Sequence, residues 1–159
     1  MKRYFYIWLF LVVVAGTAAM FFYRTLPRIH SDVPMQEIAE FGGVSLRIEY
    51  ATTEKEREKG LSGRTSVPSD YGMLFVFPND DYYGFWMKDM LAPVDMFWLD
   101  RKGYVVSFAP DVATSTYPNV FYPSAPARYV LETAAGFARS HSIATGTPLL
   151  LKNFPSVSE

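Results

Sequence analysis

Hydrophobic and polar positions alternate with a period of two along parts of the chain that follow residue 35. Between Val44 and Tyr50, every even-numbered residue is apolar and every odd-numbered residue is polar. This period puts the apolar residues on one face of a β-strand, so the pattern predicts a strand with one buried face. Gly42 and Gly43 separate it from a second strand-like run, Gln36–Phe41. Two glycines can both adopt positive φ, which predicts a two-residue hairpin turn.

Short apolar runs between turn residues predict six further strands. Their ranges are Gly72–Phe77, Phe85–Met87, Val94–Leu99, Tyr104–Ala109, Arg128–Glu132 and Ile143–Leu151. Turns are predicted at Pro78–Asp81 and Asp100–Gly103, and Pro110–Pro126, which contains four prolines, predicts a long ordered loop. The fold class is therefore mainly β: a compact barrel or sandwich-like domain of about seven or eight short strands with two short helices.

The two short helices are predicted at Thr53–Gly60 and Ala134–His141. Thr53 and Glu56 have the spacing of a capping box, and Gly60 is a natural helix stop. The many charges of the first helix are typical of a solvated face.

The run Val94–Leu99 is apolar on both faces except at Asp95, and Pro93 separates it from Phe85–Met87. A strand of this kind is covered on both sides. Burying a carboxylate is costly unless it is paired or hydrogen-bonded. Asp95 is therefore expected to have a dedicated partner, for instance Arg64 or Lys88.

The N-terminal run Tyr4–Tyr23 is uncharged, and it lies between Lys2–Arg3 and Arg24. Twenty helical residues span about 30 Å, the thickness of a bilayer's hydrocarbon core. Residues 1–23 are therefore predicted to be a transmembrane anchor or uncleaved signal, with a cleaved signal peptide as the alternative. Residues 24–35 are predicted to be a linker, 36–152 a single β-rich domain and 153–159 a tail.

The positive charges at Lys2 and Arg3 favour a cytoplasmic N-terminus. The expected location is the cell membrane, crossed once, with the soluble domain outside the cytoplasm.

Composition excludes several kinds of chemistry. The chain has no cysteine, which excludes disulfides and thiolate metal sites, and its net charge of −1 gives no reason to expect a nucleic acid partner. The two histidines, His30 and His141, have no partner at ligand spacing, so neither a metal nor a cofactor is expected. An all-oxygen site from Asp89, Asp95 and Glu132 stays open, although no calcium-loop spacing supports it.

Several motifs occur in a family-specific order. Phe85–Lys88, Pro93–Asp95, Leu99–Asp100 and Gly103 resemble the central signature of the domain-of-unknown-function 192 family, and Gly60–Arg64, Gly72–Phe77 and Tyr129–Glu132 agree with it. The resemblance covers roughly Val44 to Leu151. It departs at Asp89 and Met90, where the family usually shows an Asn-Thr pair. The resemblance implies a compact β-rich domain, often exported, with no settled activity.

Charged residues embedded in apolar strands are the candidates for a site. The predicted ligand-binding pocket consists of Arg64, Trp86, Lys88, Asp89, Asp95 and Glu132, with walls from Tyr82, Phe85 and Met87. Aromatic walls around a few polar groups are typical of small-molecule sites. The alternative is that these charges form buried pairs that serve folding alone.

Three functions follow from these residues. The leading hypothesis is a non-catalytic module that binds a small molecule or an envelope component. One rival is a hydrolase that uses Asp95 and Glu132 as acid and base. Another is a structural partner of an envelope protein, docking through Pro110–Pro126.

Overall fold

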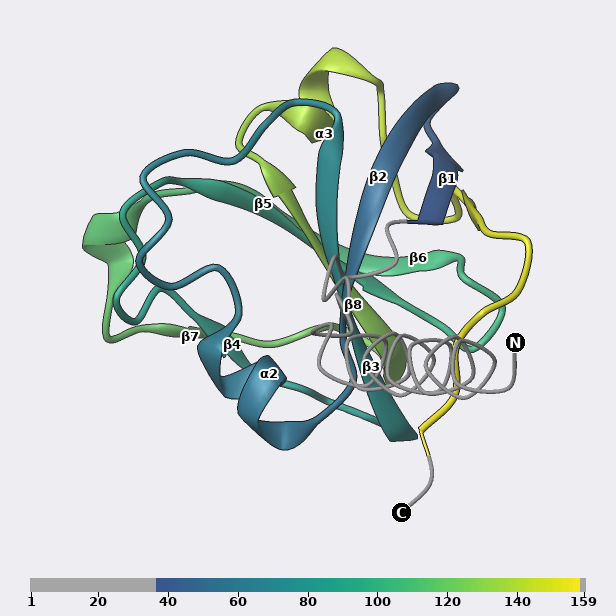
Figure 1. The fold of residues 1–159 in the computed structure, drawn as a ribbon, viewed down its shortest axis with the longest axis horizontal. Coiled ribbons are helices and arrows are strands. Elements are labelled where there is room, and N and C mark those ends of the chain that lie inside the picture. Colours follow the sequence, from purple (N-terminus) through teal and green to yellow (C-terminus); the bar gives the residue numbers. More distant parts are fainter. Residues whose placement is uncertain (1–36, 158–159) are drawn as a thin grey trace, which may run out of the picture. The chain divides into compact units, whose positions relative to one another are not determined.

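A computed structural model describes residues 37–157 (Figure 1). The strands in this range are β1 (Glu37–Phe41), β2 (Val44–Ala51), β3 (Tyr71–Asp81), β4 (Phe85–Trp86), β5 (Val94–Leu99), β6 (Val105–Val112), β7 (Val120–Phe121), β8 (Ala127–Ala134) and β9 (Leu149–Leu150). The helices are α2 (Glu54–Lys59), α3 (Phe137–Ser140) and the 3-10 turn η1 (Thr114–Thr116). The predicted anchor and linker lie outside the described residues, and no helix within 37–157 has the length and apolarity to cross a membrane.

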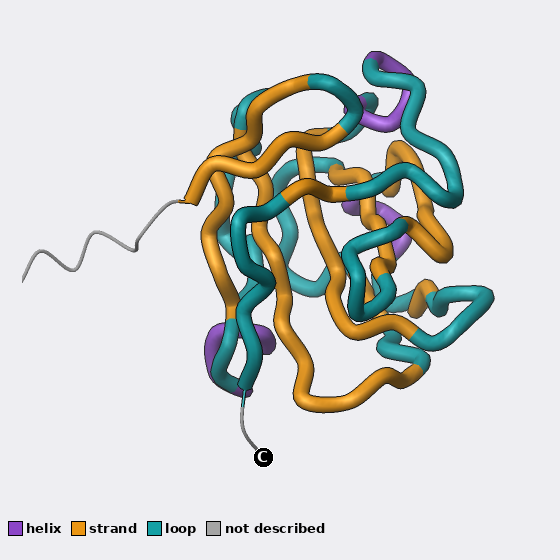
Figure 2. The backbone as a smooth tube through the Cα atoms, turned by 90° about the vertical axis from the view of Figure 1, so that its right-hand side faces the viewer, coloured by secondary structure: helices purple, strands orange, loops and turns teal. Residues whose placement is uncertain are grey.

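Seven of the strands form one sheet in the order β6-β5-β8-β3-β2-β1-β9, and β4 pairs with β7 in a separate ribbon. Every neighbouring pair in the large sheet is antiparallel except β2 and β3, which run parallel, with α2 on the connection between them. The sheet is strongly curled into a half-barrel (Figures 1 and 2). The mainly β prediction is confirmed, and the architecture is a half-barrel with a small added ribbon.

Both faces of the large sheet are covered. One face packs a cluster around Phe41, Phe97 and Leu131, and the other packs a cluster around Phe75, Met96 and Trp98. All six residues of β5 are buried, as predicted for a strand covered on both sides.

The predicted hairpin at Gly42-Gly43 is confirmed, since β1 and β2 pair around it and both glycines have positive φ. The predicted turn at Pro78–Asp81 is wrong. β3 continues to Asp81, which pairs with Ala127 after a register shift that begins at Val76. Pro78 lies within that irregular stretch, where the absence of an N–H costs no ladder bond.

The segment Pro110–Pro126 holds more strand than predicted. β6 runs through Pro110 to Val112, which an edge strand tolerates because its outer N–H groups need no partner. β7 then pairs with β4, matching Phe121 with Phe85. The predicted strand Ile143–Leu151 is reduced to β9, which pairs with the edge of β1.

Candidate functional site

A cavity of about 470 Å³ lies on the sheet face that carries Phe75, Met96 and Trp98. Its lining comes from α2, the turn that follows it, β3, the segment around β4 and one residue of β8. We call this hollow the α2–β4 cavity. Its volume is within the range of small-molecule sites.

Glu132 of β8 is the most buried of the charged residues that line the cavity. In the sheet it is aligned with Met73 of β3 on one side and Met96 of β5 on the other. Its side chain is only 4 % exposed and has no hydrogen-bond or ion-pair partner among residues 37–157. Burial raises the pKa of Glu132 to about 8. At neutral pH this carboxyl is therefore largely protonated and can donate as well as accept a hydrogen bond.

Aromatic side chains form the walls. Phe75 meets Phe85 edge-to-face with ring centroids 4.8 Å apart, and Phe77 stacks on Tyr83 at 3.6 Å. The indole N–H of Trp98 donates to the Tyr83 carbonyl oxygen at 2.8 Å, which ties the wall to the core. These contacts make the walls preorganised apolar surfaces.

Helix α2 forms one side of the mouth. It begins with the predicted capping box, in which Thr53 and Glu56 bond each other's backbone N–H groups. Arg57 donates to the Val76 carbonyl oxygen at 2.9 Å and lies over the Phe77 ring. The charged residues of α2 at the mouth are Glu54, Arg57, Glu58 and Lys59.

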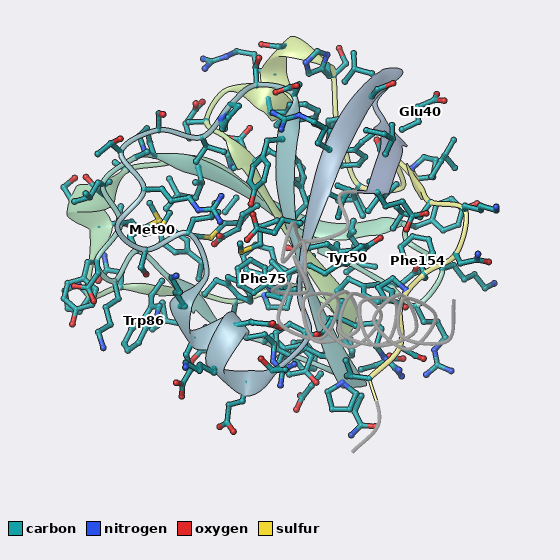
Figure 3. All side chains as sticks on the ribbon, in the orientation of Figure 1. Glu40, Tyr50, Phe75, Trp86, Met90 and Phe154 are labelled. Carbon is teal, nitrogen blue, oxygen red and sulfur yellow. The ribbon has the colours of Figure 1, made fainter. Side chains whose placement is uncertain are left out.

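The segment around β4 forms the other side of the mouth. Trp86 is 47 % exposed and has the Lys88 ammonium 5.8 Å from its ring centroid. Ser62 donates its hydroxyl hydrogen to the Lys88 carbonyl oxygen, which holds this segment against the turn after α2. Figure 3 labels Phe75, Trp86 and Met90, three of the lining residues, on the side of the sheet that carries α2 and β4.

Three of the six predicted site residues line this cavity: Trp86, Lys88 and Glu132. Arg64 does not. Its guanidinium bonds both carboxylate oxygens of Glu49, at 2.9 and 3.0 Å, and the Tyr71 hydroxyl. Asp89 is exposed beside the cavity, and its backbone carbonyl accepts from Gly63. Its φ of 56° suits Asp as well as the Asn usual in the family.

The predicted pairing of Asp95 with Arg64 or Lys88 is wrong. Asp95 is fully buried, and its carboxylate accepts three backbone N–H groups, from Asp111 at 2.7 Å, Gly136 at 3.1 Å and Ala138 at 2.7 Å. Asp95 thereby fastens the end of β6 and the start of α3 to the central strand.

Asp95 and Glu132 lie on opposite faces of the sheet. In the β5–β8 register Asp95 is aligned with Thr133 and Met96 with Glu132, and successive residues of a strand alternate between faces. The carboxylate pair that the hydrolase hypothesis requires is therefore not formed. The same separation rules out a shared oxygen site for these two residues, and residues 37–157 contain no group of three His, Asp or Glu that could hold a metal ion.

Sequence reasoning missed much of the wall. Of the predicted wall residues, Phe85 lines the cavity, whereas Met87 is buried in the core and Tyr82 points to solvent. The contributions of α2, Phe75 and Phe77 were not predicted. Phe75 and Phe77 are two residues apart and therefore share one face of the strand, and this spacing is the sequence signal that could have identified them. No sequence signal indicates that α2 packs beside them, because that contact depends on tertiary structure.

A family model described as uncharacterized ACR, DUF192, matches residues 37–151. The chain belongs to the DUF192 family. This DUF192 chain is also 30 % identical over 101 residues to a UPF0127 protein of Thermococcus gammatolerans. That match spans 62 % of this chain and 62 % of the relative, less than two thirds of its length.

Two solved structures resemble this DUF192 domain. One is a Sinorhizobium meliloti protein named as a proposed transcription regulator, with a TM-score of 0.67, 27 % identity and coverage of 72 % of this chain and 92 % of that one. The other is a protein of unknown function from Novosphingobium aromaticivorans, with a TM-score of 0.64, 25 % identity and coverage of 79 % and 92 %. Family and neighbours thus agree on the fold and assign no catalytic activity.

Proposed function

We propose that this protein is a non-catalytic binding module that takes a small organic molecule into the α2–β4 cavity. The observation that carries the proposal is Glu132, a nearly buried carboxyl group that faces an aromatic hollow without a partner. No side-chain nitrogen or oxygen atom of residues 37–157 is fully buried without a hydrogen-bond partner, so the unpartnered carboxyl group of Glu132 opens onto the cavity, where an occupant can reach it. A bound ligand supplies the missing partner.

The rest of the cavity supports the same function. Five aromatic residues, Phe75, Phe77, Tyr83, Phe85 and Trp86, line it, and its volume suits a ligand of modest size. Its charged groups come from α2, Lys88 and Glu132. Residues that serve folding alone, by contrast, have their polar atoms satisfied within the chain, as Asp95 and Arg64 do.

We place this binding module at the cell membrane, held by residues 1–23 with the domain outside the cytoplasm. The support is the uncharged run Tyr4–Tyr23 and the flanking Lys2 and Arg3. The name of the Sinorhizobium meliloti neighbour is not extended to this chain, because a net charge of −1 offers no electrostatic footprint for DNA.

A thermal-shift screen of the full chain in detergent against sugars, nucleotides, organic amines, organic acids and divalent cations tests the function. A ligand specific to the folded protein raises its unfolding temperature by mass action. We expect at least one organic compound to do so, and the shift to disappear in Trp86→Ala, which removes one wall.

Tyr122→Ala is the matched control, because Tyr122 is also an exposed aromatic residue but does not line the cavity. A shift that survives Trp86→Ala as well as Tyr122→Ala places the ligand elsewhere and contradicts the proposal. A screen without any hit contradicts it too.

A further inference from the structure

We propose that the ligand is an organic amine with an aromatic or alkyl body, bound with its ammonium group against Glu132 and its body between the aromatic walls. This inference rests on the proposed function and narrows it to one chemical class.

The interior of the cavity offers an ammonium group two kinds of partner. Glu132 is an acceptor with no competing donor among the described residues, and the side chains aligned with it on either side are the thioethers of Met73 and Met96. A nearly buried carboxylate forms its strongest hydrogen bonds with donors that are cations. When Glu132 is ionised it repels an incoming anion, and a plain hydrocarbon leaves it without a hydrogen-bond partner.

The aromatic walls favour a cation as well. Ring faces attract ammonium and guanidinium groups, and two of the cavity's rings already carry one: Arg57 lies 5.2 Å from the centroid of Phe77, and Lys88 lies 5.8 Å from that of Trp86. Phe75 and Phe85 also line the cavity, and neither has a cation over its ring among residues 37–157. Phe75 is almost fully buried, so the partly exposed ring of Phe85 is the larger surface open to the ligand's ammonium or its apolar body.

A metal ion is a poorer match for the same carboxyl group. Divalent cations require several oxygen or nitrogen ligands, and residues 37–157 contain no group of three or more His, Asp or Glu side chains that could hold one. An ammonium group needs only hydrogen-bond acceptors and an apolar enclosure.

Several charged side chains line the cavity together with Glu132. From α2 these are Glu54, Arg57, Glu58 and Lys59, and from the β4 segment Lys88, while Tyr83 also lines the cavity and its hydroxyl donates to the Asn79 carbonyl oxygen. On β3 and β5 the residues aligned with Glu132 are uncharged. Burial raises the pKa of Glu132 to about 8, so its ionisation changes as the pH rises from 6 to 8.

Amine binding therefore drives a proton off Glu132. In the free protein this carboxyl is largely protonated below a pKa of about 8, whereas the ion pair requires the carboxylate. Affinity for an amine is expected to rise from pH 6 to pH 8, with release of up to one proton per bound ligand at pH 6.5.

Calorimetric titration of the full chain in detergent with three probes of similar shape tests the ligand class. The probes are 2-phenylethylamine, 2-phenylethanol and 3-phenylpropionate. We expect the amine to bind about tenfold or more tightly than the alcohol at pH 8, and the anion to bind most weakly. Titrations in two buffers of different ionisation enthalpy measure the proton released.

Glu132→Gln keeps the shape of the side chain and removes its charge. In this variant we expect amine and alcohol to bind with equal affinity within about threefold, and the pH dependence to vanish. Glu40→Gln is the matched control, because it removes the charge of an exposed glutamate on β1 that does not line the cavity, and the preference for the amine is expected to survive it.

Equal affinity for amine and alcohol, tighter binding of the anion, no binding of the amine, or a preference that persists in Glu132→Gln would each overturn this inference. If the screen still finds a ligand that requires Trp86, the proposed binding function stands while its assignment to amines fails.

Discussion

Glu132 is the residue whose environment differs most from that of an ordinary carboxyl group. Its pKa is about 8 in the folded protein and near 4.5 when the chain is unfolded. Because the unfolded state ionises first, the free energy of unfolding falls as pH rises from about 4.5 to about 8, by up to about 1.4 kcal/mol per pH unit. Burial of this group therefore costs stability at neutral and alkaline pH.

Glu132→Gln removes that cost. We expect the variant to gain stability relative to the native chain at pH 8, by about 2–4 kcal/mol, and to gain far less at pH 5. Urea unfolding at both pH values measures the difference. A gain of the same size at pH 5 and pH 8 would show that Glu132 ionises in the folded protein as it does in water.

Asp95 is the opposite case, a buried carboxylate with its bonds satisfied. Asp95→Ala leaves three backbone N–H groups without their acceptor, so we expect a loss of about 3 kcal/mol or more in the free energy of unfolding. Arg139→Ala removes only an exposed pair with Asp111 and is expected to cost less than about 1 kcal/mol. Denaturant titration compares them, and equal losses would refute the structural role of Asp95.

At this scale the sequence indicates which residues are unusual but not what they contact. Asp95 and Glu132 stand out because each interrupts an apolar strand. The donors that satisfy Asp95 are backbone groups of residues 111, 136 and 138, which no side-chain pattern reveals. Cations that are near Asp95 in the sequence, such as Lys88, do not identify its hydrogen-bond donors, which are set by the fold.

Among the elements, the β1–β2 hairpin shows how the two glycines of one turn can have different structural requirements. Both glycines have positive φ, yet only Gly42 lies against other atoms: a Cβ there would be 2.3 Å from Cδ1 of Ile143, whereas one at Gly43 would meet nothing within 4 Å. A side chain would strain the backbone at both positions, but only at Gly42 would it also collide with neighbouring atoms.

Gly43→Ala is therefore expected to cost about 1–2 kcal/mol, the price of a left-handed alanine. Gly42→Ala is expected to cost at least about 1 kcal/mol more, because Ile143 must move as well. Thermal unfolding of the two variants gives the comparison. A Gly43 variant that is the less stable of the two would contradict the packing described here.

The alternation of Val44–Tyr50 and the Gly42-Gly43 pair predict β1 and β2, and the apolar run Val94–Leu99 predicts β5, because these patterns act locally. Proline is a less reliable signal for the end of a strand. Pro78 and Pro110 predict strand ends, but both residues lie inside strands. Whether a missing N–H matters depends on whether a neighbouring strand needs it, and that is decided by sheet order. For the same reason the β4–β7 ribbon could not be foreseen.

In the domain as a whole, the two faces of the sheet carry different features. One face packs the cluster around Phe41 and Phe97 and carries the bonds of Asp95, and the other carries the cavity and Glu132. The proposed binding site and the hydrogen bonds of Asp95 thus lie on different faces of the same strands. The family signature spans both, because β5 and β8 contribute to each.

The proposed membrane location has a direct test with the whole chain. We expect the full-length protein to sediment with membranes and to resist carbonate extraction, and a variant lacking residues 2–24 to be released. Mass spectrometry of the full-length protein separates an intact anchor from a cleaved signal peptide. Recovery of the uncleaved chain in the high-speed supernatant would contradict membrane anchoring.

The position of Trp86 has one more consequence. Of the tryptophans in residues 37–157, Trp98 is sealed in the interior and Trp86 stands half in water at the cavity mouth. A compound that enters the cavity dehydrates one indole and leaves the other untouched. With Trp8, the third tryptophan of the sequence, replaced by phenylalanine, the chain carries a built-in optical reporter of occupancy, and a blue shift in emission with reduced quenching by iodide marks the bound state.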